Sequence, residues 1–190
     1  MSCKIILASG SPRRKALLEG LDIDFTVRLI PDIDESRPPD VPVADIPCHI
    51  ARNKAEAYRQ TMQSDELIIT ADTIVVLDGD VIEKPADSAD AISILRRLSG
   101  RSHQVITGVV LTTTGQQREF SAVSTVSFAV LTDDEINYYV DRYKPYDKAG
   151  AYGIQEWIGY VAVQSIEGSF YNVMGLPVQR LYRELKAIEQ

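Results

Sequence analysis

The feature that most constrains this chain is an aspartate inside an otherwise apolar, β-forming run. Residues 67–77 read Leu-Ile-Ile-Thr-Ala-Asp-Thr-Ile-Val-Val-Leu, and the Asp78-Gly79 pair that follows is a hairpin signal. A carboxylate buried in such a strand costs several kcal/mol unless it meets a cation, a metal ion or hydrogen-bond donors. Asp72 therefore either turns to solvent at a break in the strand, or faces a cleft where it can hold a metal ion or orient water.

Strand and helix patterns are interspersed along the rest of the chain. Ser11-Pro12 predicts a helix start, and Thr132 with Glu135 forms a capping box at a second one. Strands are expected at residues 4–8, 67–77, 81–82, 103–113, 120–130 and 158–166, and residues 25–30 are a further apolar stretch. Helices are expected at 13–21, 44–62, 88–98, 132–143 and from 177 onward, and loops at 31–39, 144–155 and 168–175. Hairpins and crossovers together favour an α/β or α+β fold with a mixed sheet.

Length and charge limit the classes of function. The 190 residues contain no repeat or linker, so one domain over residues 1–190 is expected. A net charge of −7 argues against binding to a nucleic acid duplex, which needs a basic stripe. No apolar run approaches the ~20 residues that span a bilayer, so we expect no membrane segment and a cytoplasmic protein. Cys3 and Cys48 could form at most one disulfide, which nothing in the sequence requires, and no C-x-x-C or H-x-x-x-H spacing favours a zinc site, so we expect two buried thiols.

The loop Ser9-Gly10-Ser11-Pro12-Arg13-Arg14 is a candidate phosphate site. Glycine allows a close backbone approach, the hydroxyls can donate, and two guanidiniums match the geometry of phosphate oxygens. The segment is neither a Walker A loop nor a G-x-G-x-x-G motif. A solvated basic first turn of a helix explains the same residues.

Single charged residues give weaker signals. Lys54 lies at the edge of the apolar face of the helix expected at 44–62, and Lys84 stands in Glu83-Lys84-Pro85. A lysine at such a position is most often a surface residue whose charged end reaches water. Glu35, in a polar and proline-rich loop, becomes a candidate metal ligand only together with Asp72.

Two glycine-bearing segments, residues 147–155 and 168–177, combine amides and aromatic side chains in irregular stretches beside strands. Such segments suit the recognition of a base by hydrogen bonds and stacking. Ordinary loop anatomy accounts for their composition equally well.

Together these motifs resemble the Maf-like nucleoside triphosphate pyrophosphatases, also described as septum-formation inhibitor proteins. The resemblance spans nearly the whole chain, with five motifs in the family's order. They are Leu7-Ala8-Ser9-Gly10-Ser11-Pro12-Arg13-Arg14, Ala71-Asp72-Thr73-Ile74-Val75 with Glu83-Lys84-Pro85, Ser99-Gly100 with His103-Gln104-Val105, and the two glycine segments. The form of residues 147–155 looks like the branch that acts on dTTP and UTP. One departure is that Glu156 stands where the family often has glycine.

The resemblance implies hydrolysis of a nucleoside triphosphate to the monophosphate and diphosphate. It implies Mg²⁺ or Mn²⁺ as cofactor and an elongated mixed sheet with helices and two lobes around a central cleft, as in inosine triphosphate pyrophosphatases. Asp72 matches the proton acceptor, while Arg13, Thr73 and Gln155 match positions linked to substrate choice. Glu35, Lys54 and Lys84 match polar residues that line the site. We further expect Ser9, Arg14, Asp147 and Lys148 to bind substrate, and Asp72 with Glu35 to hold the metal.

Two other readings remain open at this stage. The first is a non-enzymatic regulator of cell division that binds a partner protein, for which a buried aspartate is unnecessary. The second is a pyrophosphatase of non-standard purine nucleotides. The expected partner is a small-molecule nucleoside triphosphate rather than a nucleic acid or a membrane, and the sequence is compatible with a monomer or a homodimer.

Overall fold

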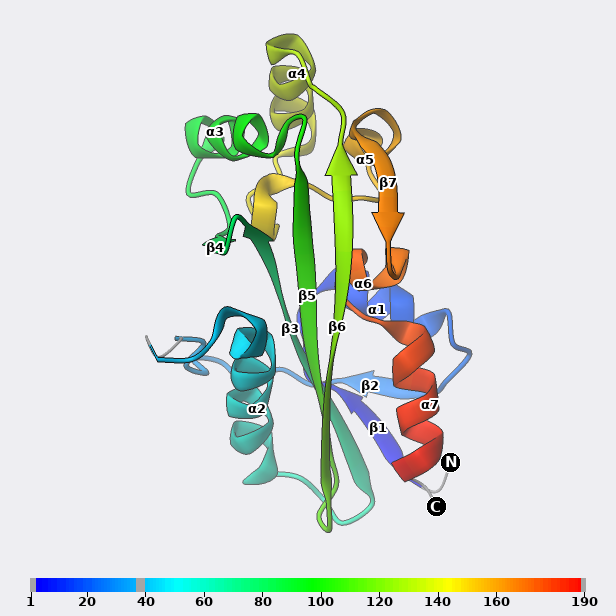
Figure 1. Ribbon diagram of the computed structural model, residues 1–190. Helices are drawn as coiled ribbons and strands as arrows, with labels where there is room; N and C mark the ends of the chain where they lie inside the picture. Colours follow the sequence, from blue (N-terminus) through cyan, green and yellow to red (C-terminus); the bar gives the residue numbers. More distant parts are fainter. Residues whose placement is uncertain (1–2, 37–39, 189–190) are drawn as a thin grey trace. The chain divides into compact units, whose positions relative to one another are not determined.

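Seven strands of the described chain form one mixed sheet in the computed structural model, which covers residues 3–36 and 40–188 (Figure 1). The strand order is β2-β1-β3-β5-β6-β7, and β4 pairs with β3 beside this path. β1 is parallel to β2 and β3, whereas β4 is antiparallel to β3 and β7 is antiparallel to β6. The strands are β1 Lys4–Leu7, β2 Phe25–Val27, β3 Glu66–Leu77, β4 Asp80–Ile82, β5 Ser102–Thr112, β6 Gln117–Phe128 and β7 Val163–Glu167.

Helices connect most of these strands, which confirms the predicted α/β class with a mixed sheet. In the described ranges they are α1 Pro12–Glu19, α2 Ile46–Arg59, α3 Ser88–Leu98, α4 Asp133–Tyr143, α5 Trp157–Ala162, α6 Phe170–Met174 and α7 Val178–Ile188. Two short 3₁₀ helices, η1 Val43–Asp45 and η2 Ala149–Ala151, complete the set. Within these same ranges, no helix combines the length and the apolarity that crossing a membrane requires.

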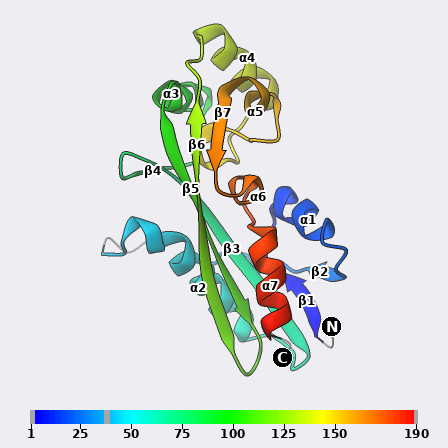
Figure 2. The ribbon, with the colours of Figure 1, turned by 45° about the vertical axis from the view of Figure 1, so that its right-hand side comes forward.

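The chain divides into two compact units. Among the described residues, the first unit holds 3–36, 40–72, 107–122 and 175–188, and the second holds 73–106 and 123–174. Each of β3, β5 and β6 has residues in both units. In the second unit, α3 and α4 pack against each other (Figure 2). Their buried side chains form a core with Ile158 and Ala162 of α5.

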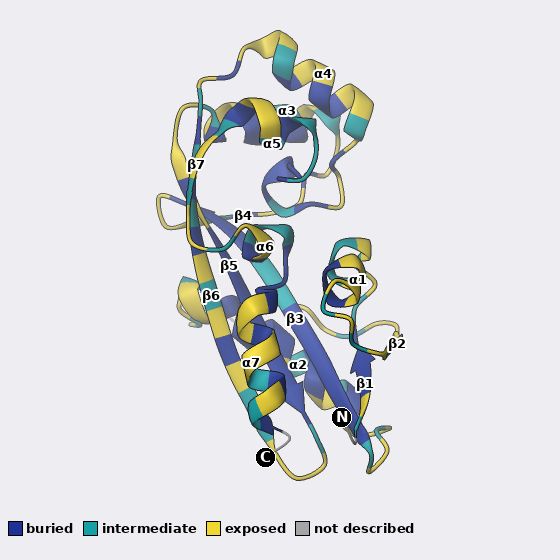
Figure 3. Ribbon diagram, turned by 90° about the vertical axis from the view of Figure 1, so that its right-hand side faces the viewer, coloured by how far each residue is buried: buried dark blue, intermediate teal, exposed yellow. Residues whose placement is uncertain are grey.

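In the first unit, α2 and α7 lie on opposite faces of the sheet (Figures 1 and 3). The α7 helix is amphipathic, and its buried residues are Val178, Leu181, Leu185 and Ile188, as the spacing predicts. On the other face, α2 lies close to β5 at Gly108. A Cβ atom on Gly108 would stand 2.3 Å from the backbone nitrogen of Cys48, so only glycine allows this approach.

Local signals correctly predict several element ends. Ser11 caps α1, and its hydroxyl accepts a hydrogen bond from the Arg14 amide at 3.4 Å. Thr132 and Glu135 form the predicted capping box at the start of α4. Asp78 and Gly79 both have positive φ angles, 54° and 89°, as a two-residue hairpin between β3 and β4 requires.

Two predictions near the C-terminus are wrong. Residues 158–166 are not one strand, because they form most of α5 and then β7. A short apolar run has no decisive period, and here Ile158 and Ala162, four residues apart, are buried on one helical face. Residues 168–175 are not only loop, since α6 occupies Phe170–Met174. The Ser169 hydroxyl accepts a hydrogen bond from the Asn172 amide at 3.3 Å and stabilises the first turn of α6.

Two smaller predictions concern the N-terminal region. Cys48 is buried as expected, but Cys3 is only half-buried because it precedes β1 at the rim of the sheet. The polar loop expected at 31–39 contains no helix or strand from 31 to 36, and its residues 37–39 lie outside the described ranges. Glu35 therefore stands in an irregular segment, as predicted.

Candidate active site

The candidate residues fall into two groups, one in each unit. Ser9, Arg13, Arg14, Glu35, Lys54 and Asp72 belong to the first unit, and Thr73, Lys84, Asp147, Lys148 and Gln155 belong to the second. Within each unit the structure brings several of these side chains together by hydrogen bonds and ion pairs.

Asp72 does not turn to solvent, because it is only 15% exposed and is paired with a lysine. The Lys54 ammonium lies 3.1 Å from Asp72 Oδ1 and 3.2 Å from Glu35 Oε1. The Lys54 side chain is 11% exposed, whereas Glu35 is 55% exposed. One cation thus meets both predicted carboxylates, and it offsets the cost of placing Asp72 in an apolar strand.

Lys54 is not a surface lysine whose charged end reaches water, so the more common reading of its sequence position is wrong. The packing of α2 on the sheet explains the difference. The Thr70 hydroxyl on β3 donates a 2.7 Å hydrogen bond to the carbonyl of Ala51 on α2. This bond, together with the close approach at Gly108, sets the position of α2 along the sheet and places Lys54 beside Asp72.

Arg14 forms hydrogen bonds with three segments of the first unit. Its guanidinium donates to the carbonyls of Gly175 at 2.8 Å and Ala71 at 2.9 Å, and to the Ser9 hydroxyl at 3.4 Å. Burial lowers the pKa of Arg14, while the negative charge of Asp72 opposes that shift. The guanidinium remains charged, so it adds a fixed cation beside the residue that precedes Asp72.

Ser9 and Arg13 lie around the start of α1. The Ser9 hydroxyl accepts hydrogen bonds from the Ser11 amide at 3.3 Å and from Arg14, and the half-buried Arg13 follows in the first turn. The positive charge of Arg13 is close enough to contribute to the lowered pKa of Arg14. The predicted phosphate loop is thus a local concentration of cations and hydroxyls, although the whole chain is acidic.

The carboxylates of the first unit have the chemistry to bind a divalent cation. Asp72 and Glu35 both contact the Lys54 ammonium. Their carboxylates supply hard oxygen donors, which are the ligands that Mg²⁺ and Mn²⁺ prefer. Among the described residues, no group of three or more His, Cys, Asp or Glu side chains could hold a metal ion. Two carboxylates suit Mg²⁺ sites, in which waters and substrate phosphates complete the coordination.

In the second unit, Lys148 is buried and held by two acids. Its ammonium lies 2.7 Å from Asp147 Oδ1, which is exposed, and 3.3 Å from Glu156 Oε1. Tyr139 on α4 donates from its hydroxyl to Glu156 Oε2 and accepts a 3.0 Å hydrogen bond from the Gly153 amide. Burial, followed by the proximity of Glu156, raises the pKa of Tyr139 far above its ordinary value.

The remaining predicted residues of this unit differ in exposure. The side-chain oxygen of Gln155 is buried and has no hydrogen-bond partner within the described ranges. Thr73 on β3 is half-buried, and Lys84 is exposed in the connection between β4 and α3. The segment with Gln155 is linked to that connection by the Gly150 amide, which donates to the Glu83 carbonyl at 3.4 Å.

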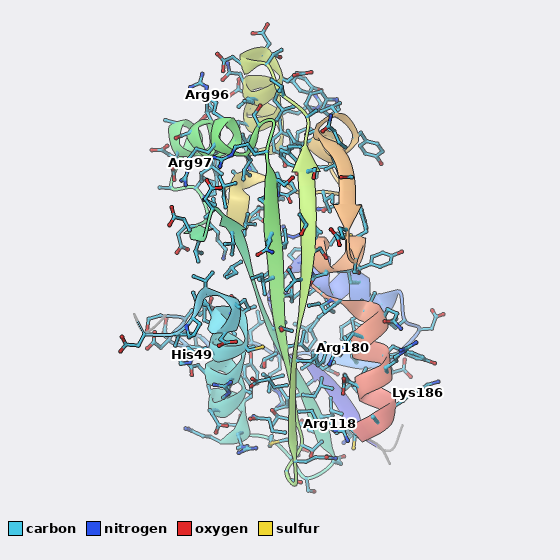
Figure 4. All side chains as sticks on the ribbon, in the orientation of Figure 1. His49, Arg96, Arg97, Arg118, Arg180 and Lys186 are labelled. Atoms are coloured by element: carbon cyan, nitrogen blue, oxygen red, sulfur yellow. The ribbon has the colours of Figure 1, made fainter. Side chains whose placement is uncertain are left out.

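Other arginines labelled in Figure 4 serve surface contacts outside these groups. Around α7, Arg118 and Arg180 both pair with Glu184, at 3.7 and 3.3 Å, and the Arg180 guanidinium lies 5.2 Å from the Phe120 ring centroid. On α3, Arg96 pairs with Asp133 at the N-terminus of α4 at 2.8 Å. Exposed pairs of this kind contribute little stability and do not resemble the buried lysine sites.

Sequence reasoning missed the tyrosines that organise both groups. In the sequence, Tyr139 is only one residue of the helix expected at 132–143, and Glu156 is only a departure from the family pattern. Tyr58 on α2 is likewise only one residue of the helix expected at 44–62. Its hydroxyl donates to the Arg28 carbonyl at 2.7 Å and accepts from the Ile30 amide at 3.0 Å, which fixes the segment leading toward Glu35.

The chain is similar to several known proteins. A family model described as Maf-like protein matches residues 4–188. A "dTTP/UTP pyrophosphatase" of Bacteroides thetaiotaomicron is 62% identical over 185 residues, covering 97% of this chain and 96% of the relative. A protein with the same name from Flavobacterium johnsoniae is 43% identical over 185 residues, covering 97% and 95%. The solved structure of a nucleoside-triphosphatase (dITP/XTP pyrophosphatase) from Mycobacterium abscessus covers 97% of this chain and 98% of its own, with 17% identity and a TM-score of 0.47.

Proposed function

We propose that this chain, which belongs to the Maf-like protein family, hydrolyses dTTP and UTP to the nucleoside monophosphate and diphosphate. The single observation that carries the proposal is the buried Asp72–Lys54 pair with Glu35 on the same ammonium. Relatives that are 62% identical over nearly the whole chain and are named dTTP/UTP pyrophosphatases support the choice of substrate. A purely structural strand has no need of this costly arrangement.

In the first unit, Asp72 would orient the attacking water and accept its proton. The water oxygen forms a bond to the α-phosphorus, the bond from that phosphorus to the bridging oxygen breaks, and diphosphate leaves. Arg13, Arg14 and Lys54 would stabilise the negative charge that moves onto the leaving group, and the Ser9 hydroxyl would bind a phosphate oxygen. Phosphoryl transfer of this kind depends mainly on positioning and electrostatic stabilisation.

A divalent cation, Mg²⁺ or Mn²⁺, would be held by Asp72 and Glu35. When bound, it supplies Lewis-acid polarisation of the phosphate oxygens. Lys54 then has a second role, because its ammonium balances the two carboxylates while no cation is bound. Its contacts with Asp72 and Glu35 also hold the two carboxylates in position.

In the second unit, Gln155 and Thr73 would contribute to recognition of the base. The buried and unpartnered Gln155 oxygen, within the described ranges, can accept a hydrogen bond from a ring N–H. Uracil and thymine carry such a donor at N3. Lys84, Asp147 and Lys148 would contact the substrate's polar groups, with the lysines providing positive charge near its phosphates.

The test is release of diphosphate from a panel of dTTP, UTP, ITP and 7-methyl-GTP with Mg²⁺ or Mn²⁺. We expect dTTP and UTP to give the highest kcat/KM. A preference for ITP would move the assignment to non-standard purine nucleotides. Absence of hydrolysis for every triphosphate would instead support a regulator that binds a partner protein.

A further inference from the structure

Glu156 is linked to two residues of the segment that carries Gln155, directly to Lys148 and through Tyr139 to Gly153. One carboxylate oxygen lies 3.3 Å from the Lys148 ammonium, and the other accepts the Tyr139 hydroxyl. The same hydroxyl accepts a 3.0 Å hydrogen bond from the Gly153 amide. Lys148, Glu156, Tyr139 and Gly153 thus form a continuous chain of hydrogen bonds, which we call the Glu156 network.

Burial makes these contacts stronger than surface pairs. Tyr139 and Lys148 are buried, and the Glu156 side chain is 20% exposed. Hydrogen bonds to ionised groups are stronger than neutral ones, and weak solvent screening strengthens them further. The raised pKa of Tyr139 keeps its hydroxyl protonated, so it donates to the carboxylate throughout the neutral range.

Glycines in this segment leave room for the side chains of the network. A Cβ atom on Gly153 would lie 2.8 Å from the Glu156 carboxyl carbon and 3.1 Å from the Gln155 amide nitrogen. Glycine therefore allows the Glu156 and Gln155 side chains to fold back over the turn. At the other end, Gly150 has a φ of 73°, and a Cβ there would stand 3.0 Å from Val75. A side chain at either glycine would therefore collide with its neighbours.

We infer that Glu156 and Tyr139 are positioning residues that hold Lys148 and Gln155 in place for the substrate. The inference rests on the proposed function, in which Lys148 contacts the triphosphate and Gln155 the base. Both contacts act in substrate binding before and during the reaction, which affects KM rather than kcat.

Two substitutions test the network with minimal changes of shape. Glu156→Gln removes the charge that orients Lys148, and Tyr139→Phe removes only the hydroxyl. For each variant we expect KM for dTTP to rise about tenfold while kcat stays within about twofold, since bonds to charged groups are lost without loss of a reacting group. The ratio of kcat/KM for dTTP over dCTP should fall, because Gln155 is less firmly held and cytosine carries no N–H at N3.

Matched controls come from α4 itself. Tyr143→Phe makes the same chemical change in a ring that stacks on Tyr139, with centroids 5.0 Å apart. Asp134→Asn neutralises an exposed acid of the first turn. Both controls should retain the wild-type KM and the wild-type preference for dTTP.

Hydrogen exchange of the Gly153 amide provides a readout independent of activity. Exchange should be faster in Tyr139→Phe than in wild type and unchanged in Tyr143→Phe. A purely structural role would lower the melting temperature of Glu156→Gln and Tyr139→Phe but leave KM and substrate preference at 25 °C unchanged, and that result would overturn this inference alone. A wild-type protein that hydrolyses no triphosphate would instead overturn the proposed function, together with the roles assigned to Lys148 and Gln155.

Discussion

Replacing Lys54 with methionine should destabilise the fold, because Asp72 would lose the ammonium that pairs with it. Methionine keeps the length and unbranched shape of lysine but removes the ammonium that lies 3.1 Å from Asp72 Oδ1. Removing one partner of a buried ion pair costs 3–5 kcal/mol, because the other charge is left uncompensated. The two side chains are 11% and 15% exposed, so we expect a loss of about 3 kcal/mol, near the lower end of that range.

Urea unfolding followed by far-UV circular dichroism measures this loss. The control is Lys15→Met, because Lys15 is 56% exposed and lies 3.7 Å from Glu19 one helical turn away. An exposed pair of this kind is worth below about 0.5 kcal/mol. The double variant Lys54→Met with Asp72→Asn removes both charges and should recover about 1–2 kcal/mol of the loss. Equal effects of the two lysine substitutions, or no recovery in the double variant, would refute the reasoning.

Three further predictions concern the supporting structure. Tyr58→Phe should cost about 1–2 kcal/mol in urea unfolding, because its hydroxyl joins two backbone groups of the segment after β2. Burial lowers the pKa of His103 to about 4, so wild-type stability should fall by roughly 3 kcal/mol as pH drops from about 6.5 to about 4. This pH dependence of stability should largely disappear in His103→Gln. A variant with the same pH profile as wild type would contradict the prediction. Gly108→Ala should cost several kcal/mol by forcing α2 from β5, whereas Gly115→Ala, with no atom within 4 Å of its Cβ, should be nearly neutral in thermal melts.

Elements with local chemical signals could be predicted from the sequence. Ser11 before Pro12 specifies a helix start through a side-chain hydrogen bond, and the Thr132 capping box does the same for α4. Asp78-Gly79 specifies its hairpin because both residues tolerate positive φ. In each case the determining interaction lies within a few residues, so the sequence contains it entirely.

Elements that depend on distant partners could not be predicted in the same way. Residues 158–166 are apolar enough for a strand or a helix, and burial of Ile158 and Ala162 on one face selects the helix. The burial of Lys54 depends on how α2 is placed on the sheet, which Thr70 and Gly108 determine from other strands. A lysine at the edge of an apolar face gives no sign of such partners.

The candidate site, too, could be predicted from the sequence only in part. The cost of burying Asp72 predicts that a cation lies nearby, and Lys54 is the cation that the structure supplies. The Glu156 network could not be predicted from the sequence, because neither Tyr139 nor Glu156 is an unusual residue in its local context. Their connection exists only through the fold of the second unit.

The most direct test of this account is the turnover of Asp72→Asn with dTTP and Mg²⁺. Loss of the group that orients water and accepts its proton should lower kcat about 1,000-fold, with an unchanged circular dichroism spectrum. Asp80→Asn, at an exposed position on β4, is the matched substitution and should retain wild-type turnover. Diphosphate release by Asp72→Asn within a few-fold of wild type would contradict the role given to this carboxylate.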